Sequence, residues 1–458
     1  MEKIKPQSEM NYNIISVGVF FDGTGNNGPN AASPRKPDKN NESYYGDVTN
    51  IYKLFSLFNG DEKIYIEGIG TFTGSGDDDF AIATCKNPSG ISGYSSEDKL
   101  EKAFSFTRNL LSGETAEYHF YVYGFSRGAM LARHFCYELL RECSEFSGHT
   151  VKVKFLGVFD TVESAAFSSH EVTVLQQTER ALHICALHEC RFFFPLTGLS
   201  EDSKERSDSR FVTEDSVWKE IFVPGAHADV GGGYLEGSQS VYVSPAFTEN
   251  QELFDYMESI RTTMEDAEGN KIWKDLLGDY GWDDDGISLQ AYVVKEWVYN
   301  ELPKVYGQLM IAETNAEHQV FRTGFSPSDF EIDACEHPCL VELSEALRYY
   351  VETLSPDAKP VYHYPMLSDY THISANFGLY HAALLQHPKG IAHTEFINNG
   401  LNVPGHSNDH QDKNGTRLQS EIHHIEDSFV DYAYGTNIPN NDHWNRTILM
   451  KESLYNKC

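Results

Sequence analysis

Short apolar runs of strand length recur along the first half of the chain. Each is rich in aromatic or β-branched residues, as expected of a strand buried in a sheet. Several of these runs end directly at a polar side chain or a glycine-rich turn. The runs cover residues 14–21, 64–66, 118–123, 151–159 and 221–226.

Segments with helical spacing of their apolar positions lie between these runs, at residues 50–58 and 130–140. Strands that alternate with helices predict an α/β fold with a mostly parallel sheet flanked by helices. In such sheets the functional site lies beyond the carboxyl ends of the strands. The polar residues that follow the predicted strands are therefore expected to face one crevice.

The pattern divides the chain into three parts. Residues 11–234 predict the α/β core that carries the sheet. Residues 235–359 predict a helical insertion or lid, in which 292–299 has apolar residues that we assign to a helix. Residues 360–458 are rich in loops and histidine, and we expect them to pack back on the core.

The composition narrows the class of protein. A net charge of −32 disfavours nucleic acid as a partner, and it also disfavours simple electrostatic adsorption to an anionic membrane. No apolar stretch is long enough to span a bilayer, and residues 1–9 lack the apolar segment of a secretory signal. The eight cysteines are scattered, so we expect reduced thiols rather than a disulfide scaffold. Cys335 and Cys339 lack a second pair at zinc-site spacing, and no metal is expected.

The strongest chemical signal is a G-x-S-x-G pentapeptide, Gly124 to Gly128, with Ser126 at its centre. A predicted strand precedes it and a predicted helix follows it, which is the context of a nucleophile elbow. The alternative is a plain strand–helix turn in which the serine caps the helix.

A serine nucleophile needs a histidine base and a carboxylate that orients the histidine. Ser126, Asp160 and His227 occur in the order found in α/β-hydrolases, each at a predicted strand end. Two alternatives stay open: His227 as a turn histidine bonded to Asp229, and Asp160 as a helix cap. This mechanism requires neither a metal nor a cofactor.

An acyl-transfer site also needs donors for the developing oxyanion. The N–H of Arg127, directly after the serine, is one candidate, and Gly23 or Thr24 in the loop after the first strand is the other. We expect Asp22, Gly124, Gly128 and Asp229 to support the substrate or these loops. The Asp22–Thr24 loop is similar to that of aspartyl-phosphate phosphatases, but Phe20 stands where their nucleophilic aspartate would be.

Taken in order, these motifs resemble the type VI secretion lipase effector family, first subfamily, whose catalytic domain is an α/β-hydrolase variant. Motifs in the first half of the chain carry the resemblance, with a weaker match later on. They are residues 19–27, 68–71, 124–129, 159–162 and 225–234, with residues 372–377 as the later segment.

The resemblance places the family's Ser-Asp-His triad on Ser126, Asp160 and His227. It implies phospholipase A activity on bacterial membrane lipids, delivery to the periplasm of a target cell by a secretion spike protein, and neutralisation by an immunity protein. Two alternatives remain: a non-catalytic interaction module on a hydrolase fold, and an intracellular esterase unrelated to secretion.

A strongly acidic protein must meet an acyl chain through apolar side chains. We therefore expect the region 235–359 to cover the active site and supply the lipid contact. The aromatic run at 190–195 could also touch lipid, but a run of this kind before a proline is more often core, and we interpret it as core. The insertion offers Trp273, Trp282, Trp297, Tyr299, Leu309 and Met310 for the lipid contact.

Overall fold

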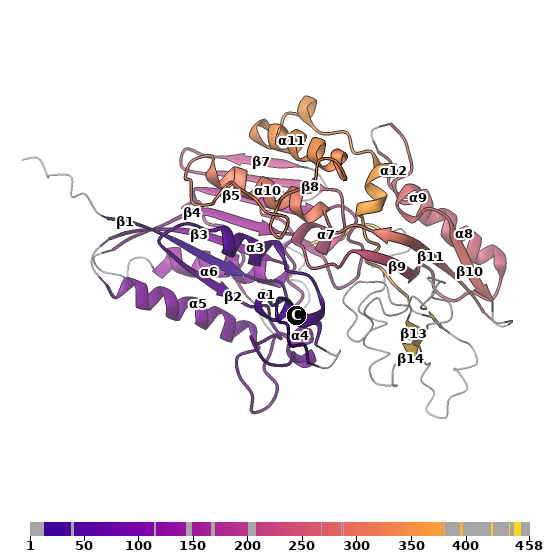
Figure 1. Ribbon diagram of the computed structural model, residues 1–458, viewed down its shortest axis with the longest axis horizontal. Helices are drawn as coiled ribbons and strands as arrows, with labels where there is room; N and C mark the ends of the chain where they lie inside the picture. Colours follow the sequence, from indigo (N-terminus) through magenta and orange to yellow (C-terminus); the bar gives the residue numbers. More distant parts are fainter. Residues whose placement is uncertain are drawn as a thin grey trace, which may run out of the picture.

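A computed structural model describes most of the chain up to residue 377 and short pieces beyond it (Figure 1). The described residues are 13–37, 41–113, 116–142, 149–165, 170–199, 208–266, 268–284, 286, 288–377, 379–380, 394–396, 423–424, 439 and 444–449.

The largest sheet in the described part of the chain has seven strands, and all neighbouring pairs are parallel except β7 with β8. This arrangement confirms the predicted mostly parallel α/β sheet. In spatial order the strands are β2 (Glu62–Ile66), β1 (Ile14–Phe21), β3 (Glu117–Phe125), β4 (Thr150–Phe159), β5 (Arg180–Ala186), β8 (Val217–Val223) and β7 (Ser209–Val212).

The register brings the carboxyl ends of three adjacent strands to one edge of this sheet. Phe21 of β1 pairs with Gly124 of β3, and Phe125 of β3 pairs with Phe159 of β4. The residues that follow these strands therefore emerge side by side, as the sequence pattern predicts.

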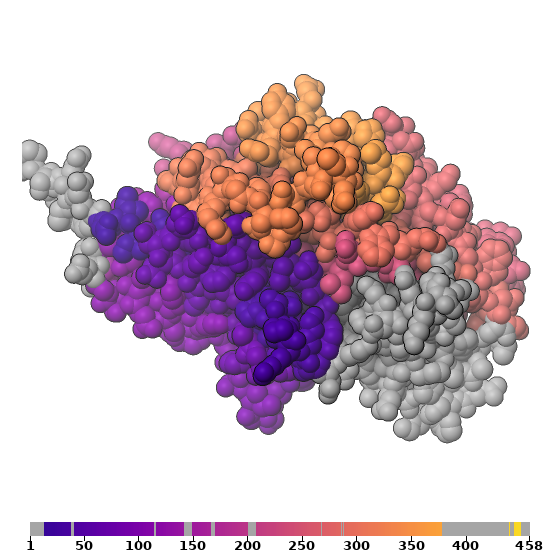
Figure 2. Space-filling model, in the orientation of Figure 1, coloured from indigo at the N-terminus to yellow at the C-terminus, as the bar shows by residue number. Residues whose placement is uncertain are grey.

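Helices cover both faces of the sheet, as Figure 1 shows. On one face α5 (Ser96–Leu111) and α6 (Arg127–Glu142) pack against it. On the other face lie α3 (Asn50–Leu57) and α10 (Leu302–Asn315), with α11 (Pro338–Thr353) packed on α10. The helices α10 and α11 therefore form a layer of the core and are not a lid. Figure 2 shows this region, in orange, lying directly against the N-terminal residues, in indigo.

The remaining short helices lie in the connections. They are α1 (Gly28–Ala31), α2 (Glu42–Tyr45), α4 (Asp79–Thr84), α7 (His227–Gly231), α12 (Tyr364–Leu367), η2 (Pro356–Ala358) and η3 (Ser368–Tyr370).

Residues 235–298 differ from the predicted helical insertion. They contain an antiparallel sheet of β10 (Tyr280–Asp284), β11 (Leu289–Val298) and β9 (Gly237–Tyr242), with α8 (Asn250–Arg261) and α9 (Ile272–Leu277) packed on it. The assignment of residues 292–299 to a helix is wrong. The β-branched and aromatic side chains of that segment instead build the central strand of this sheet.

The described parts of the C-terminal region contact the rest of the fold. Ile373, Phe377 and Trp444 pack with α8, α9 and the three-stranded sheet. The strand β15 (Ile448–Leu449) pairs in parallel with β6 (Leu196–Thr197), and a second small sheet comprises β12 (Leu379–Tyr380), β13 (Thr394–Phe396) and β14 (His423–His424).

No helix among the described residues has the length and apolar character needed to cross a membrane.

Candidate active site

Ser126 lies in a strained turn between β3 and α6. Its φ of 58° is in the left-handed region, which side chains other than glycine rarely adopt. The turn is fixed by backbone bonds, since the Ser126 N–H donates to the Phe159 carbonyl (3.1 Å) and the Ser126 carbonyl accepts from the Val162 N–H (3.3 Å). This is the geometry of a nucleophile elbow.

The two glycines of the pentapeptide are required by close packing. A Cβ atom on Gly124 would lie 2.6 Å from the Cα of Ala129, in the first turn of α6. A Cβ on Gly128 would lie 2.2 Å from the carbonyl oxygen of Asp22, in the loop after β1. The start of α6 is thus pressed against both neighbouring strand ends, which brings the Asp22–Thr24 loop next to Ser126.

His227 and Asp160 form a buried pair at the same edge of the sheet. Nδ1 of His227 lies 2.5 Å from Oδ2 of Asp160, and Oδ1 of Asp160 accepts the Ala186 N–H at 2.9 Å. Because Nδ1 faces the carboxylate, Nε2 is the ring nitrogen left for proton transfer. Burial lowers the pKa of His227 below its ordinary value, and the bond to Asp160 offsets part of that effect.

The imidazole of His227 is held against the elbow by aromatic rings. Its centroid lies 4.6 Å from that of Phe125, the residue before Ser126, and 5.0 Å from that of Phe194. Among the described residues Ser126 Oγ makes no hydrogen bond, to His227 or to any other group. The serine–histidine hydrogen bond of the predicted triad is therefore not formed here, and such bonds often tighten only with substrate.

The turn that carries His227 is fixed by two further carboxylates. Oε2 of Glu189 accepts the backbone N–H of His227 at 3.3 Å. Nε and Nη2 of Arg191 donate to the Glu189 carboxylate at 3.0 and 2.9 Å. Asp229 accepts the Ala226 N–H at 2.9 Å and lies 2.6 Å from Nδ1 of His372. Asp229 thus contacts the turn and not the ring of His227, so its geometry does not support the alternative partner for that ring.

The predicted oxyanion donors differ in their availability. The Gly23 N–H already donates to Oδ1 of Asp22 at 2.8 Å, so its assignment as a donor is not supported. Within the part of the chain that the structure describes, the N–H groups of Thr24 and Arg127 have no acceptor, and Thr24 Oγ1 is buried without a partner. Thr24 is therefore the better candidate in that loop.

Asp22 supports the loop that carries Thr24. Thr49 Oγ1 and the Tyr65 hydroxyl each donate to its carboxylate at 2.6 Å. Burial raises the pKa of Asp22 to about 6, against the opposing effect of these bonds. Its recorded contacts anchor this loop.

Arg446 is a buried group near the site that sequence reasoning missed. Its Nη1 lies 3.0 Å from Oδ2 of Asp160, the same oxygen that contacts His227. Asp160 is its one hydrogen-bond partner among the described residues. Burial by itself raises the pKa of Asp160, but Arg446 and His227 lower it to about 2. The pairing of β15 with β6 brings Arg446 there, 286 residues after Asp160.

Comparison with known proteins identifies the family. The model of the type VI secretion system phospholipase effector Tle1-like catalytic domain matches residues 16–144 and 138–247, about half of the chain. The protein belongs to this family. The matched residues include the elbow, Asp160 and His227, and the resemblance proposed from the motifs is confirmed.

One solved structure supports the same fold. It is described as the Tle1 effector bound to the VgrG spike from the type 6 secretion system, and it aligns over 98% of both chains, with 16% identity and a TM-score of 0.59. An uncharacterized protein from Pseudomonas aeruginosa aligns over 76% of this chain and 52% of its own, with 16% identity and a TM-score of 0.37, too low to indicate a shared fold. No curated protein matches the chain.

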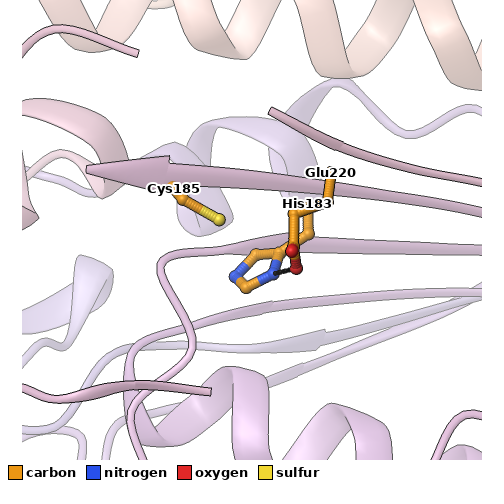
Figure 3. Close-up of side chains that lie close together, drawn as sticks. All are labelled: His183, Cys185 and Glu220. Atoms are coloured by element: carbon orange, nitrogen blue, oxygen red, sulfur yellow. Dashed lines mark hydrogen bonds and ion pairs between the residues drawn. The ribbon is translucent and has the colours of Figure 1, made fainter. Parts of the chain in front are cut away.

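This Tle1-like chain contains one group of metal-binding residue types within the described residues, His183, Cys185 and Glu220 (Figure 3). Nδ1 of His183 lies 2.8 Å from Oε2 of Glu220, and Nε2 accepts the Thr161 N–H at 3.1 Å. Both ring nitrogens are thus engaged, so a metal ion would displace one of these bonds. We interpret the group as a support for the backbone that follows Asp160.

The side chains predicted to contact lipid from the insertion fall into two groups. Trp273, Leu309 and Met310 are buried in the hydrophobic cores, so their assignment to a lipid contact is wrong. Trp282, Trp297 and Tyr299 are exposed. The three buried side chains pack helices against the sheets, and apolar contacts of this kind hold the layers of the fold together.

Proposed function

We propose that this member of the Tle1-like phospholipase effectors is a serine-dependent phospholipase A that cleaves fatty-acyl esters of bacterial membrane phospholipids. One observation carries the proposal: the strained Ser126 elbow lies at the same sheet edge as the buried His227–Asp160 pair. The family match supports the lipid substrate class.

In the proposed first step, Ser126 Oγ attacks the ester carbonyl carbon while its proton moves to Nε2 of His227. Asp160 stabilises the resulting imidazolium through Nδ1. The N–H groups of Arg127 and Thr24 stabilise the tetrahedral oxyanion. Collapse breaks the ester C–O bond, and the lysophospholipid leaves with the proton from His227.

In the second step, water attacks the acyl-Ser126 ester. His227 takes the proton from the water and returns it to Ser126 Oγ, which releases the fatty acid. All bonds and protons balance over the two steps, and the proposed route uses no metal ion.

We further propose delivery by a type VI secretion spike protein into the periplasm of a target bacterium, with an immunity protein in the producing cell. The family assignment supports delivery, and the similar solved chain is described as bound to a VgrG spike.

Fluorophosphonate labelling tests the serine mechanism. The intact protein should incorporate one fluorophosphonate at Ser126, located by peptide mass spectrometry, and then lose hydrolysis of mixed bacterial phospholipids. Activity should survive prolonged EDTA treatment. Loss of activity with EDTA, together with no labelling, would assign the protein to the metallohydrolases.

We predict that Arg446 sets the pH dependence of the reaction as a positioning residue. The acid limb of kcat/KM should lie below pH 6.5 in the wild-type protein, because burial lowers the pKa of His227 and its neutral form is the base. In Arg446→Met, the Asp160 charge is no longer shared with a guanidinium and stabilises the imidazolium more strongly. The pKa of His227 therefore rises, and the acid limb moves to higher pH.

The pH profile separates this effect from loss of stability. Removing one partner of a buried ion pair costs about 3–5 kcal/mol of unfolding free energy, so Arg446→Met should melt earlier. Arg446→Lys keeps the positive charge, so its acid limb should lie closer to that of the wild-type protein than the acid limb of Arg446→Met does. An unchanged acid limb in a folded Arg446→Met protein contradicts the positioning role.

A further inference from the structure

Two aromatic side chains protrude from the loop between β5 and β6. Phe192 and Phe193 are 54% and 46% exposed, and their rings meet edge to face with centroids 4.9 Å apart. Two adjacent large apolar side chains left in water are a common feature of surfaces that contact a partner or a membrane. The interpretation of this aromatic run as core is therefore wrong for these two residues.

This pair is continuous with the proposed active site. Phe194, the next residue, packs its ring against the imidazole of His227. The Phe194 ring also contacts the guanidinium of Arg191, which lies 3.5 Å from the ring centroid. Arg191 is itself held by an ion pair with buried Glu189. In the sequence, the exposed pair thus directly precedes the residue that packs on the proposed general base.

The loop is bonded to Ser164, which is in turn bonded to the residue that follows the nucleophile. Ser164 Oγ donates to the carbonyl of Phe193 at 2.7 Å, and Nη1 of Arg127 donates to the carbonyl of Ser164 at 3.2 Å. A turn bond from the Phe194 N–H to the Arg191 carbonyl, 3.2 Å long, closes the loop. These bonds fix the backbone that carries the aromatic pair, so little ordering of that backbone is needed when the pair binds.

A third exposed aromatic side chain belongs to the α4 segment, which Arg127 also contacts. Nη1 of Arg127 also lies 3.5 Å from Sγ of Cys85, the residue after α4. Phe80 in the first turn of α4 is 54% exposed. Arg127 therefore joins two segments that each present apolar side chains to solvent.

We propose that Phe192 and Phe193, together with Phe80 on the other segment that Arg127 contacts, form the surface that inserts into the lipid bilayer and presents an acyl ester to Ser126. The inference rests on the proposed phospholipase function and identifies where that function meets its substrate. A bilayer fits this surface because a protein of net charge −32 gains nothing from attraction to anionic lipids. Its contact must come from apolar insertion, which the aromatic pair supplies at the site itself.

The exposed tryptophans of the three-stranded sheet are the rival surface. Trp282 and Trp297 are 48% and 47% exposed, on β10 and β11. The described contacts of their rings are with Phe254 and Tyr299, and neither is a residue of the proposed site. They provide a matched pair of large exposed aromatics for comparison.

The test uses vesicles of phosphatidylethanolamine with phosphatidylglycerol. Binding is measured by cosedimentation in a Ser126→Ala background, so that it does not depend on turnover. Hydrolysis is measured on the same vesicles and on a short soluble ester with Ser126 intact. The variants are Phe192→Ser/Phe193→Ser, Trp282→Ser/Trp297→Ser, and Tyr349→Ser as an exposed aromatic control on α11.

We expect Phe192→Ser/Phe193→Ser to weaken vesicle binding about tenfold or more, because two large apolar side chains no longer leave water. Vesicle hydrolysis should fall by about tenfold more than hydrolysis of the soluble ester. The wild-type binding should persist at high salt, since screening does not weaken apolar contact. Tyr349→Ser should behave as the wild-type protein does.

Several outcomes overturn the proposal. Wild-type binding by Phe192→Ser/Phe193→Ser, or a larger loss from Trp282→Ser/Trp297→Ser, places the lipid contact elsewhere. An equal loss on both substrates indicates damage to the site rather than to a lipid surface. Failure of the proposed function itself appears separately, as absence of ester hydrolysis and fluorophosphonate labelling in the wild-type protein.

Discussion

Replacing Ser126 by alanine should abolish lipid hydrolysis, with a fall in kcat of roughly 10⁵- to 10⁶-fold. The reason is that no other group at the elbow can form the acyl intermediate. The fold should be unaffected. Serine and alanine both carry a Cβ atom, so the strain at a φ of 58° is the same for both.

The measurement is release of fatty acid and lysolipid from bacterial phospholipids, followed by mass spectrometry. Ser105→Ala, a serine on α5 that bonds to Glu101, is a suitable control and should keep full activity. Retention of even a tenth of the activity by Ser126→Ala would exclude Ser126 as the nucleophile. Unchanged toxicity and partner binding in that variant would favour a non-catalytic module.

Replacing Asp160 by asparagine should lower kcat by roughly 10³- to 10⁴-fold. The amide no longer stabilises the imidazolium, and it favours the wrong tautomer of His227. Asparagine is the fitting replacement because it has nearly the same shape and tolerates the φ of 42° at this position. The measurement is single-turnover acylation by a fluorogenic ester.

A companion variant separates catalysis from stability. Asp160→Asn leaves the buried Arg446 without its counter-charge, so it should also melt earlier. Asp160→Asn/Arg446→Met removes the unpaired cation and should recover part of that stability without recovering activity. If activity returns with stability, or if Asp160→Asn stays within tenfold of wild type, then Asp160 does not orient the base.

Local sequence patterns predicted the elements that carry the proposed nucleophile and its partners. The run at 14–21 matches β1, and the runs at 118–123 and 151–159 lie within β3 and β4. Each of these strands is buried on both faces of a parallel sheet, and that burial is what leaves a continuous apolar run in the sequence. The glycines around Ser126 were informative for a related reason, since tight packing leaves no room for a side chain there.

The predictions from the sequence pattern were wrong where an apolar segment was given a role without knowledge of the element that packs against it. The segment 292–299 is mostly strand because β9 and β10 pair with it, and pairing of that kind is not encoded locally. Leu309 and Met310 have the same apolar character whether they face lipid or a sheet. Their place in the core is decided by how α10 packs on the sheet.

The sequence by itself determined the parallel α/β core, the elbow at Ser126 and the order of the proposed triad, because those features depend on periodicity and local backbone geometry. The tertiary structure decided which charges meet. Arg446 reaches Asp160 across 286 residues, and His372 reaches Asp229 across 143. It also left Phe192 and Phe193 in solvent beside the site. Contacts between residues so distant in the chain arise only from packing of the whole fold, and no local pattern records them.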